Sequence, residues 1–241
     1  MQPYELISFP SDEALAGAAA GRWLEELSAS AQGGAPYCVA FSGGRIAKRF
    51  FAALAERATA SAVSLGHVHF FWADERCVPP TDAESNFAIA RDLLLAPLQI
   101  PSDRIHRIRG EIAPERAAAE AEAEVCRIAP MNGSGQPVLD LVFLGMGEDG
   151  HVASLFPDTP PGVIDGEAVY VPIVAAKPPP KRISINYSTL AAAREVWVLA
   201  SGADKEEALG ASLSLKGSTP LARVIQRRRK TLIFSDIRAG I

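Results

Sequence analysis

Cysteine is scarce in this chain of 241 residues, which contains only Cys38, Cys77 and Cys126. So few thiols at such irregular spacing form neither a disulfide framework nor a zinc site, so a reducing compartment is expected. Long apolar runs are absent too, and no stretch approaches the ~20 residues that a membrane helix needs. Residues 1–9 include Glu5 and lack the basic start and apolar centre of a signal peptide. The sequence therefore predicts a cytoplasmic protein that has no membrane partner.

A strong excess of either charge is also missing, because the formal net charge is −4. This balance gives no general attraction to nucleic acid, so anion binding must depend on local clusters. The one dense basic run, Arg227-Arg228-Arg229-Lys230, most simply predicts a solvated helix end before a last strand. The length and the hydrophobic content of 48% favour a single domain over residues 1–241. We expect a monomer or a small homo-oligomer.

Several catalytic signatures are lacking as well. The first glycine turn, Ser42-Gly43-Gly44, has neither a full G-x-G-x-x-G nor a P-loop G-K-[ST], so dinucleotide and nucleoside-triphosphate chemistry are not expected. The absence of G-x-S-x-G disfavours a serine esterase of the α/β-hydrolase type. His67 and His69 alternate along an apolar run, but no third ligand lies near them. No metal and no other cofactor is therefore expected.

Short apolar runs alternate with longer segments of helical pattern along the chain. The runs that predict strands are residues 4–9, 37–41, 67–72, 139–144, 169–173, 195–200 and 231–235. We also expect Ser85 to cap a helix, VASLF after His151 to begin another, residues 105–108 to form a small strand, and Gln32-Gly33-Gly34 to form a turn. This order predicts an α/β fold, with a doubly wound, mostly parallel, Rossmann-like sheet and helices on both faces.

Polar motifs directly follow four of the predicted strands. They are Ser42-Gly43-Gly44, Asp74-Glu75-Arg76, Asp149-Gly150-His151 and Ser201-Gly202-Ala203-Asp204-Lys205. If those strands are parallel, all four motifs lie at one rim of the sheet, where open α/β folds bind ligands. A glycine turn before a helix favours a phosphate through its N–H groups and the helix dipole. A lysine at a helix start adds a positive point charge.

The strongest of these motifs is the segment of residues 139–157, in which an apolar run leads into GMGEDGHVASLFP. Its glycines allow Glu148, Asp149 and His151 to gather where the strand ends. This segment resembles the signature of the 6-phosphogluconolactonases, which share a wider family with the glucosamine-6-phosphate deaminases. The block ADERCVPPTDAESN and the prolines before KRISI resemble the same group.

The resemblance implies hydrolysis of 6-phospho-D-glucono-1,5-lactone to 6-phosphogluconate, a step of the oxidative pentose phosphate pathway. The partner would then be this small phosphorylated sugar lactone. By the same resemblance, Asp74 and Glu75 face the sugar, and Arg182 meets the substrate phosphate, with Lys181 a weaker candidate. Lys205 matches a family lysine that neutralises the phosphate.

The glycine turn departs from the family pattern at its end. The family usually has a small hydroxyl residue and often a proline after the glycines, whereas Arg45-Ile46-Ala47 follows here. Ser42, Gly43 and Gly44 are still expected to bind the phosphate, and Arg45 could contribute a charge in place of hydroxyl contacts.

A lactone has an electrophilic carbonyl, so its hydrolysis needs a base for water, stabilisation of the oxyanion and a proton for the ring oxygen. Histidine suits both proton transfers because its unperturbed pKa is about 6.5. We expect His151 to take a proton from water and to return one to the ring oxygen. Asp149 or Glu148 would orient the imidazole, and Arg76 or nearby main-chain N–H groups would stabilise the oxyanion.

Two alternative functions are considered. The related deaminases carry a glutamate just before the proline, where this chain has Phe156, and an apolar ring cannot act as acid or base. This difference favours the lactonase. A non-catalytic sugar-phosphate sensor is the other alternative, but such effector domains usually follow a helix-turn-helix. The first glycine turn, at residue 43, leaves no room for one.

Overall fold

The computed structural model describes residues 2–30, 36–214 and 216–237, and within these residues the chain forms nine strands and eight α-helices. The strands are β1 (Tyr4–Ser8), β2 (Tyr37–Phe41), β3 (Val68–Trp72), β4 (Asp74–Arg76), β5 (Leu141–Gly145), β6 (Tyr170–Val174), β7 (Lys181–Ile185), β8 (Glu195–Ala200) and β9 (Thr231–Ser235). The α-helices are α1 (Asp12–Ser30), α2 (Arg45–Ser61), α3 (Asn86–Ala90), α4 (Pro114–Ile128), α5 (Pro161–Ile164), α6 (Tyr187–Ala192), α7 (Glu206–Leu213) and α8 (Pro220–Gln226). A π-helical turn, Arg91–Leu95, continues α3, and short 3₁₀ turns occur at Ser102–Arg104 and Ala203–Lys205.

Six strands form one parallel sheet in the order β1-β9-β8-β5-β2-β3. The chain runs from β2 outward to β3, whereas from β5 it runs in the opposite direction through β8 to β9. The strand order therefore reverses between β2 and β5. Loops that leave such a switch point diverge and open a crevice beyond the carboxyl ends of the strands.

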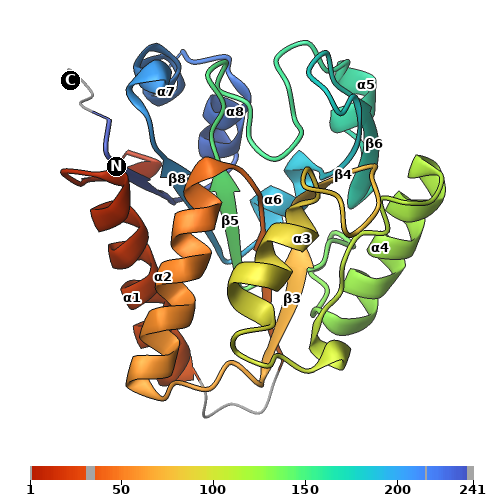
Figure 1. Ribbon diagram of the computed structural model, residues 1–241. Coiled ribbons are helices and arrows are strands. Elements are labelled where there is room, and N and C mark those ends of the chain that lie inside the picture. The colour runs from red at the N-terminus through yellow and green to blue at the C-terminus, as the bar shows by residue number, and fades with distance from the viewer. Residues whose placement is uncertain (1, 31–35, 215, 238–241) are drawn as a thin grey trace.

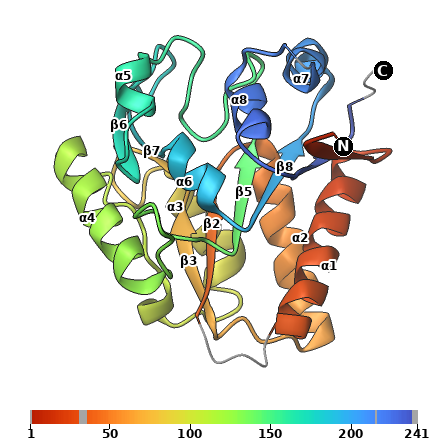
Figure 2. The ribbon, with the colours of Figure 1, turned by 180° about the vertical axis from the view of Figure 1, so that it is seen from behind.

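Helices cover both faces of this sheet. Helices α1 and α2 pack side by side in front of the sheet in Figure 1, and Figure 2 shows α6 on the opposite side. Helix α8 packs against α6 and α7. The predicted doubly wound α/β architecture is confirmed.

A second, smaller sheet lies against the carboxyl edge of the large one. Strand β4 pairs antiparallel with β7, and β7 pairs antiparallel with β6. The chain changes sheets at Ala73, whose N–H donates to the Phe41 carbonyl (2.8 Å) and whose carbonyl accepts from the Ile185 N–H (2.7 Å). This crossover carries the Asp74-Glu75-Arg76 motif to the boundary between the two sheets, close to the end of β2.

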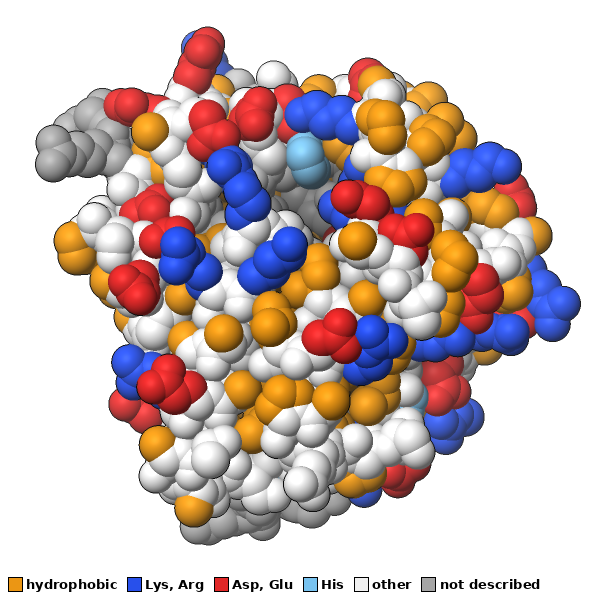
Figure 3. Space-filling view, in the orientation of Figure 1, with side chains coloured by type: hydrophobic (Ala, Val, Ile, Leu, Met, Phe, Trp, Pro, Cys, Tyr) orange, Lys and Arg blue, Asp and Glu red, His pale blue; other side chains and the backbone are white. Residues whose placement is uncertain are grey.

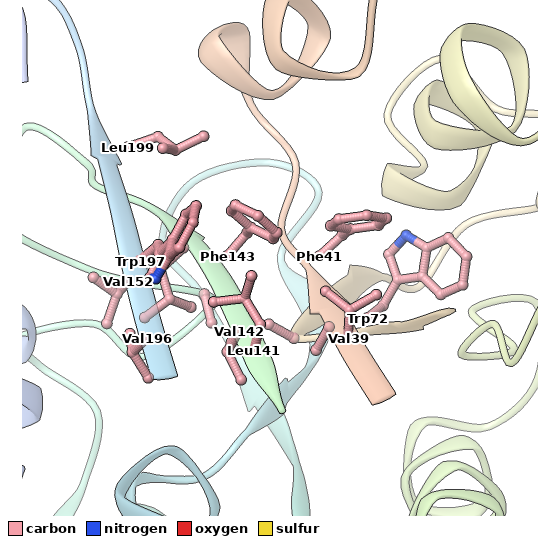
Figure 4. Close-up of a cluster of buried hydrophobic side chains, with 14 of the residues drawn as sticks. Val39, Phe41, Trp72, Leu141, Val142, Phe143, Val152, Val196, Trp197 and Leu199 are labelled. Atoms are coloured by element: carbon pink, nitrogen blue, oxygen red, sulfur yellow. The ribbon is translucent and has the colours of Figure 1, made fainter. Parts of the chain in front are cut away.

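The core of the large sheet is built from aromatic and branched side chains. Figure 4 shows Phe41, Phe143 and Trp197 on the neighbouring strands β2, β5 and β8. The Phe143 ring centroid lies 4.5 Å from that of Phe50 and 5.3 Å from that of Trp23. Close aromatic pairs contribute about 0.5–1.5 kcal/mol each beyond the area they bury. This packing holds rigid the strands whose carboxyl ends carry the polar motifs.

The helix predicted directly after His151 does not form. Val152 instead makes an isolated bridge with Leu155, and Ala153 has a positive φ of 49°. The segment is held by the small sheet, because the Ser154 N–H donates to the Ser184 hydroxyl (3.1 Å). The Ser154 hydroxyl also donates to the Asp74 carboxylate (2.8 Å). These polar contacts outweigh the helical preference of VASLF.

Two smaller expectations also need correction. The strand predicted at residues 105–108 reduces to a single bridge between Ile105 and Phe70. The basic run after α8 is not wholly solvated, because the half-buried Arg228 donates to the main-chain carbonyls of Ala193 (2.9 Å) and Arg194 (3.1 Å). Burial lowers the pKa of Arg228 to about 10.

The Ser85 cap is confirmed, since its hydroxyl accepts from the Ala88 N–H (3.2 Å). The turn predicted at Gln32-Gly33-Gly34 lies outside the described residues. Among the helices of the described chain, none combines the length and the apolar character that spanning a membrane requires.

Candidate active site

A pocket of about 260 Å³ opens at the switch point, beyond the carboxyl ends of β2, β5 and β8. Its lining comes from segments that lie far apart in the sequence: Ser42, Gly43, Gly44, Arg45, Ile46, Asp74, Arg76, Asn86, Gly145, Met146, Gly147, Glu148, His151, Ala153, Lys177, Arg182 and Lys205. Figure 3 shows a hollow in the upper part of the molecule, with basic side chains and a histidine at its rim. The four polar motifs thus meet at one place, as expected for parallel strands.

The glycine turn after β2 serves two different steric needs. Gly44 has a φ of 102°, a conformation that favours glycine, and it precedes the first turn of α2. At Gly43 the constraint is space, because a Cβ there would lie only 1.8 Å from the Asn86 Oδ1. The turn also approaches the loop after β5, since a Cβ on Gly145 would lie 3.5 Å from the Gly43 carbonyl oxygen. The glycines therefore allow three pocket segments to pack closely.

The loop after β5 presents His151 in a tight turn. The Gly147 N–H donates to the His151 carbonyl (2.9 Å), and the Gly150 N–H donates to the Gly147 carbonyl (3.0 Å). The imidazole Nδ1 lies 2.5 Å from the Asp149 Oδ1, and the same oxygen accepts from the His151 main-chain N–H (3.1 Å). Since Asp149 occupies Nδ1, Nε2 is the ring nitrogen left available to the pocket.

The charge state of Asp149 suits this arrangement. Burial by itself would raise the pKa of this carboxyl. The nearby His151 charge, and the hydrogen bonds from the imidazole and the main chain, lower the pKa and leave it below its ordinary value. An ionised Asp149 accepts a hydrogen bond from Nδ1–H and so orients the ring.

An aromatic side chain contacts both the imidazole and one of the basic side chains of the pocket. The Phe156 ring centroid lies 4.6 Å from that of His151, and the Arg182 guanidinium carbon lies 5.4 Å from the same Phe156 ring. Phe156 is only 6% exposed. His151 therefore has a carboxylate at one ring nitrogen and an apolar wall at its side.

The two acids after β3 point in different directions. Asp74 lines the pocket, and its Oδ2 accepts from the Ser154 hydroxyl (2.8 Å). Glu75 instead accepts from the main-chain N–H groups of Asn86 and Phe87, both at 2.8 Å, and it does not line the pocket. Burial raises the pKa of Glu75 to about 7. The expectation that both acids face the sugar is wrong for Glu75, because this carboxylate caps the start of α3.

Arg76 lies at the pocket wall with one end of its guanidinium anchored. Its Nη1 donates to the Glu84 carbonyl (2.7 Å) and lies 3.4 Å from the Glu84 carboxylate. The Arg76 Nε is buried without a hydrogen-bond partner in the part of the chain that the structure describes. Because the anchor uses Nη1, donor groups of Arg76 stay available for a ligand in the pocket.

Cationic side chains gather at the other parts of the pocket. Arg182 is 6% exposed, and its Nε donates to the Pro179 carbonyl (3.1 Å). Burial lowers the pKa of Lys205, and the nearby Arg45 charge acts in the same direction. Arg45 itself is largely exposed and forms an ion pair with Asp204 (2.8 Å). The buried Arg182 and the half-buried Lys205 favour an anionic ligand, because a desolvated cation gains most from an opposite charge.

The structure brings together almost all of the residues singled out in the sequence. Those that line the pocket are Ser42, Gly43, Gly44, Arg45, Asp74, Arg76, His151, Arg182 and Lys205, and Asp149 lies directly behind His151. Lys181, the weaker candidate, is exposed outside the pocket. Lys177 also lines the pocket, and sequence reasoning missed Asn86. Asn86 stands in the ADERCVPPTDAESN block, but there it looked like an ordinary residue of the helix that Ser85 caps.

His69 belongs to a polar cluster separate from this pocket. Its Nδ1 lies 2.9 Å from the His106 Nε2, and the His106 Nδ1 lies 2.8 Å from the Glu124 carboxylate. Arg104 contacts the remaining ring nitrogen of His69. Burial, followed by the charges of His106 and Arg104, lowers the pKa of His69 to about 4. In the described ranges, no three or more His, Cys, Asp or Glu side chains are grouped so that they could hold a metal ion.

The fold and the pocket together define a class of protein, the doubly wound α/β proteins with a cation-rich pocket at a switch point. A histidine backed by a carboxylate lines that pocket. The protein-family model for "Glucosamine-6-phosphate isomerases/6-phosphogluconolactonase" matches residues 10–234 of this chain. The chain belongs to this family.

Individual relatives agree with this assignment. The 6-phosphogluconolactonase of Streptomyces coelicolor is 34% identical over 244 residues, which cover 98% of this chain and 93% of that protein. The 6-phosphogluconolactonase of Haemophilus influenzae is 36% identical over 206 residues, covering 84% and 83%. The solved structure of 6-phosphogluconolactonase from Trypanosoma brucei superposes with a TM-score of 0.83 at 27% identity, covering 95% of each chain.

Proposed function

We propose that this protein hydrolyses 6-phospho-D-glucono-1,5-lactone to 6-phosphogluconate, the lactonase step of the oxidative pentose phosphate pathway. The observation that carries the proposal is one pocket that is lined both by an imidazole, oriented by a carboxylate, and by a group of cationic side chains. The substrate has the matching polarity, with a reactive carbonyl at one end and a phosphate at the other. The relatives named lactonases support the same substrate.

In the proposed mechanism His151 acts first as a base. Its Nε2 takes a proton from a water molecule whose oxygen attacks the lactone carbonyl carbon, while Asp149 holds Nδ1–H and stabilises the imidazolium that forms. Attack gives a tetrahedral intermediate with a negative oxygen. When this intermediate collapses, the bond between the carbonyl carbon and the ring oxygen breaks. The imidazolium returns its proton to that ring oxygen, and the product carboxylic acid then ionises.

Arg76 is proposed to stabilise the oxyanion. Its side chain is 18% exposed and is anchored by Glu84, so a cationic donor is already oriented before the charge develops. Asp74 stays close to the same wall as a hydrogen-bond acceptor for sugar hydroxyls.

The phosphate is proposed to bind at the cationic end of the pocket. Arg182 and Lys205 supply charge, and the main-chain N–H groups at Ser42, Gly43 and Gly44 add hydrogen-bond donors at the start of α2. Arg45 adds a further charge from the same turn, in partial competition with its ion pair to Asp204.

Phe156 argues against the related deaminase reaction. Its ring packs against His151, tilted by 42°, at the position where the deaminases carry a glutamate. An acid or base that could open an amino sugar ring is missing at this position. The Phe156 ring instead gives the imidazole an apolar contact on that side.

The decisive experiment measures acid release from freshly prepared 6-phosphogluconolactone, corrected for spontaneous ring opening. We expect release well above the spontaneous rate, and no ammonia release from glucosamine 6-phosphate. Ammonia release would instead identify the protein as a deaminase. Binding of 6-phosphogluconate without any acceleration of lactone opening would indicate a sensor instead.

A further inference from the structure

Asn86 places an unpartnered hydrogen-bond acceptor at the wall of the pocket. The residue is only 1% exposed, and its Oδ1 has no hydrogen-bond partner among the described residues. Ser42, which also lines the pocket and is 8% exposed, likewise has a buried Oγ without a partner in the described part of the chain. Buried polar atoms are nearly always paired, so two unpaired atoms at one pocket point to a ligand.

The orientation of the Asn86 amide is fixed by its neighbours. Its Nδ2 donates to the Asp74 main-chain carbonyl (2.9 Å) and lies 3.4 Å from the Asp74 Oδ1. Both of these atoms are acceptors, so only the NH₂ group can face them. Oδ1 therefore points the other way, toward Gly43, where the missing Cβ leaves room for it.

The backbone of Asn86 is equally well held. Its N–H donates to the Glu75 carboxylate (2.8 Å), and the preceding Ser85 caps α3. The side-chain Oδ1 of Asn86 is thus held in one position before any ligand binds.

The chemistry of this oxygen restricts what it can bind. An amide oxygen only accepts hydrogen bonds, so it does not suit a phosphate or a carboxylate and requires a donor. The adjacent Asp74 carboxylate is a second acceptor on the same wall. A sugar ring offers hydroxyl donors between its reactive carbon and its phosphate. The cationic side chains would therefore bind the phosphate in one part of the pocket. The acceptor oxygens of Asn86 and Asp74 would bind sugar hydroxyls in another part.

We propose that the Asn86 Oδ1 accepts a hydrogen bond from one ring hydroxyl of the sugar and so determines which lactones are hydrolysed. This role rests on the lactonase function proposed above and makes it more specific. Ser42, whose hydroxyl also has no partner among the described residues, lines the same pocket. The contact selects the substrate and takes no part in the proton transfers.

The test compares kcat/KM of the unmodified protein and Asn86→Ala on the phosphorylated lactone and on three deoxy analogues that lack the hydroxyl at C2, C3 or C4. Asn86→Ala is expected to lower kcat/KM for the full lactone about tenfold or more. With the unmodified protein, kcat/KM for one of the deoxy analogues should be lower than for the full lactone by a similar factor. For that analogue alone, the kcat/KM values of the variant and of the unmodified protein should agree within about twofold, because the contact is already absent.

Asn186→Ala is the matched control. Asn186 is fully buried and caps α6 by accepting from the Tyr187 N–H (2.7 Å), but it does not line the pocket. Its loss should reduce thermal stability while leaving the ratios of kcat/KM between the four lactones unchanged.

Two results would overturn the proposal. The first is an equal loss for Asn86→Ala on all four lactones, which indicates a purely structural role. The second is equal hydrolysis of all three analogues and the full lactone by the unmodified protein, a result that needs no variant to fold. Should Asn86→Ala not fold, Asn86→Leu, which is closer in shape, takes its place. Failure of the lactonase function itself is distinct, because no lactone would then open faster than in buffer.

Discussion

An imidazole can act as a base only when one ring nitrogen carries its proton and the other is free. In His151 the Nδ1 lies 2.5 Å from Asp149, whose pKa stays below its ordinary value although burial opposes this. The carboxylate is therefore ionised at neutral pH and selects the tautomer with the proton on Nδ1. Replacement of either member should then be visible as a loss in kcat, not only in binding.

His151→Ala is expected to lower kcat for lactone hydrolysis about 10²- to 10⁴-fold, the usual contribution of a general base. Thermal unfolding should change little, because the side chain is partly exposed at the pocket. His67→Ala is the matched control, since His67 precedes β3 and so lies at the opposite, amino-terminal edge of the sheet. Acid release at saturating lactone is the measurement. Normal turnover of a folded His151→Ala protein would refute the assignment.

At the scale of single residues, the sequence predicted side chains that stand in recognisable motifs. His151, Asp149 and Arg182 belong to such motifs, and they meet at the pocket as expected. The sequence did not reveal that Glu75 points away from the pocket, toward the start of α3. Asp74 and Glu75 are adjacent acids on a strand, and only their neighbours in the fold decide which one lines the pocket. Asn86 was missed for a related reason, since its role depends on contacts with Asp74 and Gly43 that no local pattern encodes.

The start of α3 is an element that depends on a buried charge. Glu75 is 2% exposed and receives the Ser85 hydroxyl (3.0 Å) and the N–H groups of Asn86 and Phe87. Burial raises its pKa to about 7, although the main-chain N–H groups oppose the shift. The protonated carboxyl is therefore favoured in the folded protein. Its contribution to stability is fully present at a pH below the carboxyl pKa of the unfolded chain, and it is lost as the pH rises through about 7.

The prediction concerns the pH dependence of stability in Glu75→Gln. The amide removes an acceptor oxygen, so the variant should be less stable than the unmodified protein by about 1–3 kcal/mol at pH 5. This difference should shrink as the pH rises to 8, by at most about 3 kcal/mol, because only the unmodified protein must ionise a buried group. Urea unfolding at several pH values measures both quantities. If the free energies of unfolding of the variant and the unmodified protein run parallel with pH, Glu75 does not titrate in this range. The control is Glu56→Gln, a change at an exposed position of α2.

The glycine turn between β2 and α2 is a second element with a sharp steric limit. Gly43→Ala would bring a Cβ to 1.8 Å from the buried Asn86 amide, so α3 or the turn must shift. We expect a loss of about 1–3 kcal/mol in the free energy of unfolding and a loss of at least about tenfold in kcat/KM. Gly133→Ala is the control, because Gly133 has an ordinary φ and nothing within 4 Å of its Cβ position. Equal behaviour of the two variants would contradict the close packing.

Most helices and strands were predictable because the spacing of their apolar residues and the residues that cap the helices indicated the same structure. Strands β2, β8 and β9 have the predicted bounds, and Ser85 caps α3 as expected. The segment after His151 failed because its local preference conflicts with long-range polar contacts. Ser154 is bonded to Asp74 and to Ser184, residues 80 and 30 positions away, and these contacts favour turns over a helix. The small antiparallel sheet was equally hidden, since its pairing joins distant short strands.

At the scale of the whole molecule, the net charge and the pocket charge have opposite signs. The chain carries a net charge of −4, whereas the pocket lining holds five cationic side chains, which are Arg45, Arg76, Lys177, Arg182 and Lys205. The two acids of the same lining are Asp74 and Glu148. The parallel sheet produces this separation, because it brings the ends of distant strands to one edge. A phosphorylated ligand should therefore be attracted locally to a protein that repels anions in general.

This separation of charge predicts a salt dependence of substrate binding. Raising the ionic strength from about 0.02 M to 0.5 M shortens the Debye length to a few Å, so KM for the lactone should rise several-fold while kcat stays nearly constant. Lys205→Gln should raise KM at low salt and weaken this dependence, because it removes one of the half-buried pocket charges. Lys230→Gln is the matched control, since Lys230 precedes β9 at the other edge of the sheet and pairs with Glu5. Because both variants lose one positive charge, a difference in their salt slopes isolates the local field of the pocket. Identical slopes would mean that the ligand responds only to net charge, and the cationic end would then have no role in binding the phosphate.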